Sequence, residues 1–308
     1  MPHIIRSLQD LQAMADNLGG HYALGASLDA RATAHWNGGA GFVPIGTSGA
    51  AFRGSFDGMG HTIDGLSIHR PGENHVGLFG YALNATLRNV GLVGGRIQGA
   101  ESVGGLVGYF GATDGGAACI SHAYATAQVQ GSLDNAGGLV GHHEAYGGTS
   151  CISGAYACGA VTSTGSNVGG LVGHNEAWRG TARIANAYAT GPVAGRDYAG
   201  GLVGYNDALE GMALISHAYA TGAVTATGAV VGGLVGMNST GTVEHSFYAT
   251  TDQDGQPINR GLRSNGQGKT LDALKQRSTF AGWRMGDGNS VWHIDEGHGT
   301  PQLRRLPR

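Results

Sequence analysis

Lysine is almost absent from this sequence: among 308 residues only Lys269 and Lys275 are lysines, and charged residues make up 13% of the chain. The formal net charge is −3. A chain with so little charge offers no basic surface for nucleic acid or for an anionic membrane, and we expect neither as a partner. A surface so poor in lysine is more typical of a protein that works outside the cell than of a cytosolic enzyme.

Long hydrophobic runs are missing too. No apolar stretch reaches the roughly 18 residues that a membrane-spanning helix requires, so we expect no membrane insertion. Residues 1–18 lack the apolar core of a signal peptide, so we expect an exported protein to contain this chain as a monomeric segment of something longer. Three cysteines are too few for a disulfide scaffold.

Glycine, by contrast, accounts for 59 residues, far above the usual ~7%. The glycines follow no three-residue period, which excludes collagen. With 41% hydrophobic residues and low charge, the chain can bury a core, which argues against disorder.

One short motif recurs at a nearly fixed spacing. The sequence GGLVG occurs at 104–108, 137–141, 169–173, 200–204 and 232–236, so that its leucines lie 31 to 33 residues apart. A second motif of the type Ile-Ser-His-Ala-Tyr-Ala-Thr keeps step with it, and a third apolar position follows at Val129, Val161, Val193 and Val224. A period near 32 indicates a repeat architecture.

Short strands suit these repeats better than helices. Each glycine costs ~1 kcal/mol inside a helix, and glycines interrupt the apolar runs every few residues. About three strand-like segments per repeat fit one triangular coil of a parallel β-solenoid. Crossovers between parallel strands are nearly always right-handed. We therefore predict an all-β, right-handed parallel β-helix with coils of about 32 residues, in which residue i lies beside residue i+32.

This stacking predicts columns of like side chains inside the solenoid. The leucines of the GGLVG motifs form one column. A second column consists of Ile120, Ile152, Ile184, Ile215 and Val243, with Leu87 and Ile63 extending it.

Both ends of the repeat array change character, and we expect short helices to cap them. Residues 7–18 have apolar residues at helical spacing behind Ser7 and Asp10, a capping-box variant. Residues 270–283 predict a second short helix, and 291–303 a strand pair. The predicted organisation is an N-terminal cap at 1–40, irregular first coils at 41–103, a regular solenoid at 104–250 and a C-terminal cap at 251–308.

The copies of VGGLVG, each followed by a strand of the AYATG type, resemble GLUG repeats. Such repeats occur in bacterial surface proteins, including filamentous-haemagglutinin-like adhesins and some cell-surface peptidases. The resemblance covers roughly residues 40–303 and implies a secreted or cell-surface location. It implies that the repeats are a scaffold and not themselves a catalytic site. The zinc-binding H-E-x-x-H motif of those peptidases is absent, because His143-Glu144 is not followed by the second histidine.

Familiar catalytic motifs are missing, and the segments that follow each GLVG remain as candidates. The sequence contains no P-loop, no G-x-S-x-G and no dinucleotide-binding fingerprint, and we predict no catalytic residues, cofactor or metal. We interpret the remaining segments as corner loops in which carboxylates, aromatic rings and apolar side chains stack in rows. The candidate ligand-binding residues are His142, His143, Glu144, Tyr146, His174, Asn175, Glu176, Trp178, Tyr205, Asn206 and Asp207.

Three interpretations of this corner stay open. In the first, the corner consists only of structural turns in which Asn175, Asn206 and Asn238 form an amide ladder, and the chain is a pure structural spacer. In the second, the corner binds a glycan or a surface protein, which makes the chain a non-catalytic adhesive or stalk segment. Two carboxylates one coil apart (~5 Å) could also hydrolyse glycosides, which makes the chain a carbohydrate-active enzyme. Against an enzyme, the predicted strands carry Gly, Leu and Val where β-helix enzymes project their acids.

Two further columns could face outward. Tyr124, Tyr156, Tyr188 and Tyr219 share a register. We expect a turn at Ser121-His122 to point this row outward, where it would be a flat binding stripe; an inward row would be core. Cys119 and Cys151 lie one coil apart and within disulfide reach, so a disulfide and a pair of buried thiols are equally expected.

Overall fold

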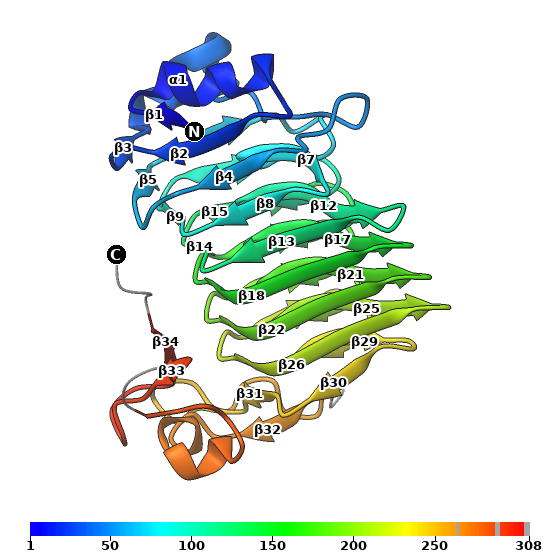
Figure 1. The fold of residues 1–308 in the computed structure, drawn as a ribbon. Helices are drawn as coiled ribbons and strands as arrows, with labels where there is room; N and C mark the ends of the chain where they lie inside the picture. Colours follow the sequence, from blue (N-terminus) through cyan, green and yellow to red (C-terminus); the bar gives the residue numbers. More distant parts are fainter. Residues whose placement is uncertain (263–264, 287–289, 305–308) are drawn as a thin grey trace.

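The computed structural model describes residues 1–262, 265–286 and 290–304, and the chain winds into a parallel β-solenoid of about seven turns (Figure 1). Strands one coil apart pair side by side, as in the register of Ile152 with Ile184 and of Ile184 with Ile215. Among the named ladders of the described residues, the antiparallel one joins β33 (Trp292–His293) to β34 (Gln302–Leu303). The predicted all-β solenoid with coils of about 32 residues is confirmed.

Four sheets run along the solenoid. Sheet I consists of β1 (His3–Ile5), β2 (His21–Leu24), β3 (Leu28–Asp29), β4 (Ser55–Asp57), β5 (Thr62–Asp64), β8 (Thr86–Arg88), β9 (Gly91–Val93), β13 (Ala117–Ser121), β14 (Tyr124–Ala125), β18 (Thr149–Ala157), β22 (Thr181–Ala189), β26 (Met212–Ala220), β30 (Thr242–Glu244), β31 (Phe247–Ala249) and β32 (Gln267–Lys269). Sheet II consists of β6 (Ser67–His69), β10 (Arg96–Gln98), β15 (Gln128–Gly131), β19 (Val161–Ser163), β23 (Val193–Gly195) and β27 (Val224–Ala226).

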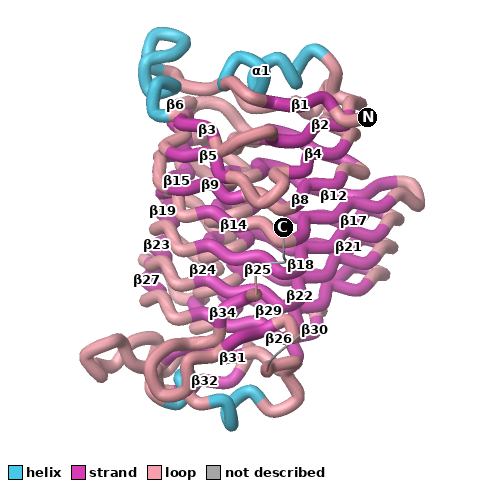
Figure 2. Tube along the Cα trace, turned by 60° about the vertical axis from the view of Figure 1, so that its left-hand side comes forward, coloured by secondary structure: helices cyan, strands magenta, loops and turns pink. Residues whose placement is uncertain are grey.

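Sheet III consists of two-residue strands at the GGLVG corner: β11 (Val103–Gly104), β16 (Ala136–Gly137), β20 (Val168–Gly169), β24 (Ala199–Gly200) and β28 (Val231–Gly232). Sheet IV consists of β7 (Phe79–Leu83), β12 (Val107–Thr113), β17 (Val140–Tyr146), β21 (Val172–Trp178), β25 (Val203–Leu209) and β29 (Val235–Asn238). The path of one coil is therefore III, IV, I and II, and Figure 2 shows the strands stacked along the solenoid axis.

The predicted columns form the core. The motif leucines, Leu106, Leu139, Leu171, Leu202 and Leu234, are all fully buried. The four isoleucines of the second column are also buried, whereas Val243 at its end is half-buried; Leu87 and then Phe56 continue the column toward the N-terminus. The prediction for Ile63 was wrong: Ile63 lies beside Leu92, because β5 pairs with β9 while β4 pairs with β8.

The second glycine of each GGLVG motif is required by the close stacking of the corners. A Cβ atom added to Gly170 would overlap the carbonyl oxygen of Gly201 and lie 2.8 Å from the Cβ of Ala189. Glycine therefore lets the backbones of neighbouring coils approach each other at the point where sheet III turns into sheet IV.

A kink turns the tyrosine row outward, as expected. His122, Gly154, Asn186, His217 and His245 all have a left-handed backbone, with φ between 43° and 60°. The kink resets the alternation of sheet I, so the flanking alanines enter the core and the tyrosines leave it. Neighbouring tyrosine rings then stack at centroid separations between 4.7 and 5.1 Å.

The two ends differ in how they are covered. At the N-terminus, α1 (Leu8–Gln12) begins with the predicted Ser7–Asp10 capping box and continues into η1 (Ala13–Asp16), while η2 (Arg31–Gly39) follows β3. At the C-terminus the predicted helix over 270–283 is replaced by two short 3₁₀ turns, η3 (Ala273–Lys275) and η4 (Arg277–Phe280). The reason is that Gln276, between them, has an extended backbone.

The C-terminal segment, with β33 and β34, lies beside the last coils of the solenoid (Figure 1). Its side chains cover part of the tyrosine row. Tyr219 is buried beneath Phe280, Trp283 and Trp292, and its hydroxyl donates a 2.5 Å hydrogen bond to the carbonyl of Pro301. Burial falls toward the N-terminal half of the row, where Tyr124 and Tyr156 are half-buried and Tyr156 still packs against this cluster. Among the described residues, no helix combines the length and the apolar character needed to cross a bilayer.

Candidate functional site

The candidate residues lie on strands of sheet IV and not in corner loops, so that interpretation of the sequence was wrong. Strands β17, β21 and β25 each run seven residues, from the valine of GLVG through the whole polar segment. Each strand ends only at the next glycine-containing turn, at Gly147, Gly180 and Gly211. The acids are therefore projected from strands, which removes the argument raised above against an enzyme.

Alternation along these strands sends every second candidate into the interior. His143, Asn175 and Asn206 are fully buried, so the prediction that they contact a ligand was wrong. They form a ladder: His143 Nδ1 lies 2.6 Å from Asn175 Oδ1, and each amide donates to the next over 2.7 Å as far as Asn238. The predicted amide ladder exists, but it lies along the inner side of sheet IV and not at a turn. Burial lowers the pKa of His143 to about 4, which keeps its ring neutral.

The outward side chains form three rows, and the first row consists of stacked rings. In register along sheet IV it contains Tyr81, Tyr109, His142, His174 and Tyr205. The rings of His142 and His174 stack at 4.7 Å, and those of His174 and Tyr205 at 4.8 Å. Tyr81 and Tyr109 were missed from the sequence, although each also follows its copy of the motif directly.

The second row carries carboxylates: Glu144, Glu176 and Asp207 lie in register. His142 Nε2 donates a 3.1 Å hydrogen bond to Glu176 Oε2, and this bond is the main reason why the pKa of Glu176 is lowered. Burial and the neighbouring charge of Glu176 raise the pKa of Glu144 to about 7. Asp207 accepts a 3.0 Å hydrogen bond from the Thr240 hydroxyl.

The third row lies at the outer edge of the sheet and is apolar. Tyr146 and Leu209 are 42% and 59% exposed, and Trp178 lies between them. The Tyr146 and Trp178 rings meet edge to face at 4.6 Å. The name outer face is used below for the outward side of sheet IV, formed by these three rows.

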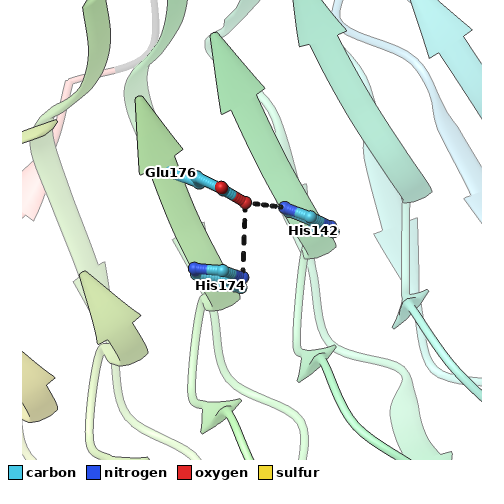
Figure 3. Close-up of side chains that lie close together, drawn as sticks. All are labelled: His142, His174 and Glu176. Carbon is cyan, nitrogen blue, oxygen red and sulfur yellow. Dashed lines mark hydrogen bonds and ion pairs between the residues drawn. The ribbon is translucent and has the colours of Figure 1, made fainter. Parts of the chain in front are cut away.

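Two histidines and one carboxylate converge on the outer face, as Figure 3 shows. His174 Nδ1 lies 3.8 Å from Glu176 Oε2, the same oxygen that His142 contacts. Burial lowers the pKa of His174 to about 3, so its ring is neutral near pH 7. The three side chains present nitrogen and oxygen atoms of the kind that bind metal ions, a grouping that the sequence analysis did not identify.

The cysteine pair lies elsewhere, on sheet I. Cys119 and Cys151 are opposite each other in neighbouring coils and are free thiols. A hydrogen bond from Cys151 lowers the pKa of Cys119. The structure brings the two sulfurs together as predicted from the register, and the disulfide stays a prediction.

Comparison with known proteins gives the repeat its name. A family model described as the GLUG motif matches residues 164–193 and 195–225. These two segments, successive coils of the solenoid, are similar to the GLUG motif. The matched segments contain β21 and β25, two of the three strands that carry the candidate residues.

Two curated relatives are similar to part of this chain. Over 147 residues, 46% of its length, this chain is 40% identical to "Halomucin" of Haloquadratum walsbyi, of which it covers 2%. Over 112 residues, 35% of this chain, it is 36% identical to a "Putative Gly-rich membrane protein" of Evansella cellulosilytica, of which it covers 13%. The chain thus spans only a small part of either relative.

One solved structure shows the same fold over almost the whole length. The crystal structure of "a putative immunoglobulin A1 protease from Bacteroides ovatus" superposes with a TM-score of 0.67 and covers 98% of this chain and 92% of its own. The sequence identity is 21%, so this likeness concerns the fold alone.

Proposed function

We propose that this chain is a non-catalytic, adhesive segment of an exported surface protein, of the filamentous-haemagglutinin-like kind, and that its outer face binds a glycan. The GLUG repeats and relatives named as a mucin and as a membrane protein support a surface location. The rigid stack of coils suits a stalk that presents one face along its length.

The three continuous rows of the outer face carry this proposal. Apolar and aromatic side chains along a flat sheet can pack against sugar rings, and adjacent carboxylates can accept hydrogen bonds from hydroxyls. Trp178 lies beside Tyr146 and Leu209 in one row, and Glu176 beside Glu144 and Asp207 in the next. A protein partner would bind to the same three rows, and the test below distinguishes it from a glycan.

A glycan array with the purified chain tests the proposal. The sequence itself supplies substitutions that fit the stack: Trp178→Leu copies Leu209, and Tyr146→Thr copies Thr113, in the same row. We expect the double variant to lose most of its binding while it keeps the wild-type circular dichroism. The control is Tyr124→Phe, which alters the tyrosine row of sheet I. Binding that survives the double variant, or is absent from the wild type, would contradict the proposal and favour a spacer or a protein-binding face.

A carbohydrate-active enzyme is the second candidate, favoured by the neighbouring carboxylates. Glu144 has a raised pKa of about 7, while the pKa of Glu176 is lowered. Glycosidases use such a pair, in which one carboxyl group donates a proton as the general acid and the other is ionised. Hydrolysis assays on every glycan that binds distinguish the two. Turnover that disappears in Glu144→Gln and in Glu176→Gln supports the enzyme, and binding without turnover supports the adhesive segment.

A further inference from the structure

We propose that His142, His174 and Glu176 form a binding site for one divalent transition-metal ion of the zinc type. This inference goes beyond the adhesive role and does not depend on it. It rests on where the three side chains lie and on which atoms they present.

The donor atoms already point at a common centre (Figure 3). Glu176 Oε2 lies 3.1 Å from His142 Nε2 and 3.8 Å from His174 Nδ1, and the donor atoms of the three residues all lie within 4.8 Å of one another. In a tetrahedral zinc site with bonds of about 2.0–2.1 Å, two donor atoms are roughly 3.3 Å apart. The two contacts of Glu176 are close to that value, so small side-chain rotations complete the set.

The donor types select the class of ion. Two imidazole nitrogens with one carboxylate oxygen suit zinc, cobalt, nickel or copper, whereas calcium and magnesium prefer sites made of oxygen. Three protein ligands also leave a position open for water or for an oxygen of a bound molecule. This open coordination position of the ion faces outward, because the side chain of Glu176 is 28% exposed and that of His142 15%.

The backbone fixes the three side chains before any ion binds. His174 and Glu176 lie two residues apart on the same side of β21, and His142 is the partner of His174 on β17. The stacked rings of Tyr205 and His142 hold His174 between them. His142 must release its hydrogen bond to Glu176, and its ring proton then resides on Nδ1, so the ring stays neutral as a ligand.

Neighbouring coils lack the full set. The coil before has Tyr109 and Gly111 at the equivalent positions, and the coil after has Tyr205 and Asp207. Within the part of the chain that the structure describes, this is the one group of three such side chains close enough to hold an ion. The proposal therefore predicts one ion per chain.

Titration of the EDTA-treated, dialysed chain with zinc chloride in a calorimeter tests this prediction. We expect saturation at one zinc ion per chain and a rise in the thermal unfolding midpoint, because an ion that binds only the folded state stabilises it. Cobalt(II) in place of zinc should give visible absorption bands whose position and intensity report nitrogen and oxygen ligands. Absence of saturable binding would overturn the proposal.

Variants that copy residues at the same register in neighbouring coils test whether these three side chains bind the ion. His142→Tyr and His174→Tyr copy Tyr109 and Tyr205 at the same register, and Glu176→Gln keeps the shape of the side chain. Each should weaken zinc binding at least about tenfold, since even residues that only support a ligand are worth 10- to 100-fold. Asp207→Asn, one coil away, is the matched control and should bind as the wild type does.

Binding that is equally strong in all three ligand variants would place the ion elsewhere and overturn the proposal. Circular dichroism and the metal-free unfolding midpoint show whether each variant is folded. Glycan binding is measured separately in EDTA, so a chain that binds glycan but not zinc overturns this inference alone.

Discussion

Single polar side chains on the inner side of sheet IV stabilise the stack, because they form hydrogen bonds with the equivalent side chains of neighbouring coils. Asn206 accepts from Asn175 and donates to Asn238 in the interior. Asn206→Ala removes the partner of the buried Asn175 amide and of the half-buried Asn238 amide oxygen, and a buried group left unpaired costs about 1–3 kcal/mol. We expect a loss of about 2–4 kcal/mol in the free energy of unfolding, measured with urea. Asn74→Ala, at an exposed position, is the control, and an equal loss in both variants would contradict this role.

The two adjacent thiols of sheet I give a second prediction at this scale. A mild oxidant such as diamide should join Cys119 to Cys151, with loss of one proton from each thiol, because the residues face each other in neighbouring strands. The number of titratable thiols should fall from three to one without dimer formation. Cys119→Thr, which copies Thr86 in the same register, should keep both of its thiols. Disulfide-linked dimers in the wild type would contradict the pairing.

In sheet IV the sequence predicted which residues share a row but not which rows reach the solvent. The spacing of 31 to 33 residues placed Glu144 beside Glu176 and Asn175 beside Asn206. The polar segment after GLVG nevertheless resembled a loop, because buried asparagines are rare in strands. They are tolerated here because an identical amide lies one coil away, and only the assembled stack provides that partner.

At the scale of the strand and the turn, glycine sets how closely coils stack. Gly170→Ala would force a Cβ atom into the carbonyl oxygen of Gly201 at the GGLVG corner. We expect it to cost about 1–3 kcal/mol in the free energy of unfolding, the usual cost of overpacking. Gly72→Ala, in an exposed turn with no atom near the added Cβ, should change stability by less than about 0.5 kcal/mol. Similar losses in the two variants would contradict the requirement for close approach.

The docked C-terminal segment should respond to pH through His217. This ring lies 5.9 Å from Trp283 and 5.3 Å from His245, with Arg183 and Glu244 as charged neighbours. Burial, followed by His245 and Arg183, lowers the pKa of His217. A lowered histidine pKa means that the stability it contributes is complete above the unfolded value of ~6.5 and is lost as the pH falls below it.

Tryptophan fluorescence measured between pH 7.5 and pH 5 should therefore report loosening of this segment on acidification. His217→Asn copies Asn186, which has the same left-handed backbone one coil earlier and does not titrate. This variant should show a smaller change over the same range. If His217→Asn showed the same pH profile as the wild type, the fluorescence change would come from other titrating groups and the role of His217 would be contradicted.

The C-terminal segment was also the element that the sequence described least well. Its strand pair was predicted, but its helix was not formed, because two short 3₁₀ turns place Phe280 and Trp283 against Tyr219. That contact joins residues about 60 positions apart, outside the repeat, so no periodicity could have predicted it. The same contact covers much of the tyrosine row that could have been a binding stripe.

At the scale of the whole molecule, the period alone was sufficient to predict the architecture. Each coil buries its leucine, isoleucine and valine only against the coils on either side, so stability is a sum of nearest-neighbour contacts. The outer face is a consequence of the same stacking, since one coil supplies His142 and the next supplies His174 and Glu176. Fold and site therefore depend on a single condition, that residues one full coil apart lie side by side.

Deletion of one whole coil tests this condition most directly. Removing 172–202 joins Leu171 to Val203 and closes every column, so that Tyr156 lies beside Tyr219. We predict a folded protein with an unchanged β-type circular dichroism spectrum, cooperative unfolding and no zinc binding, because His174 and Glu176 are gone. Removing 172–187, about half a coil, should prevent folding. A whole-coil deletion that unfolds as the half-coil deletion does would contradict the account.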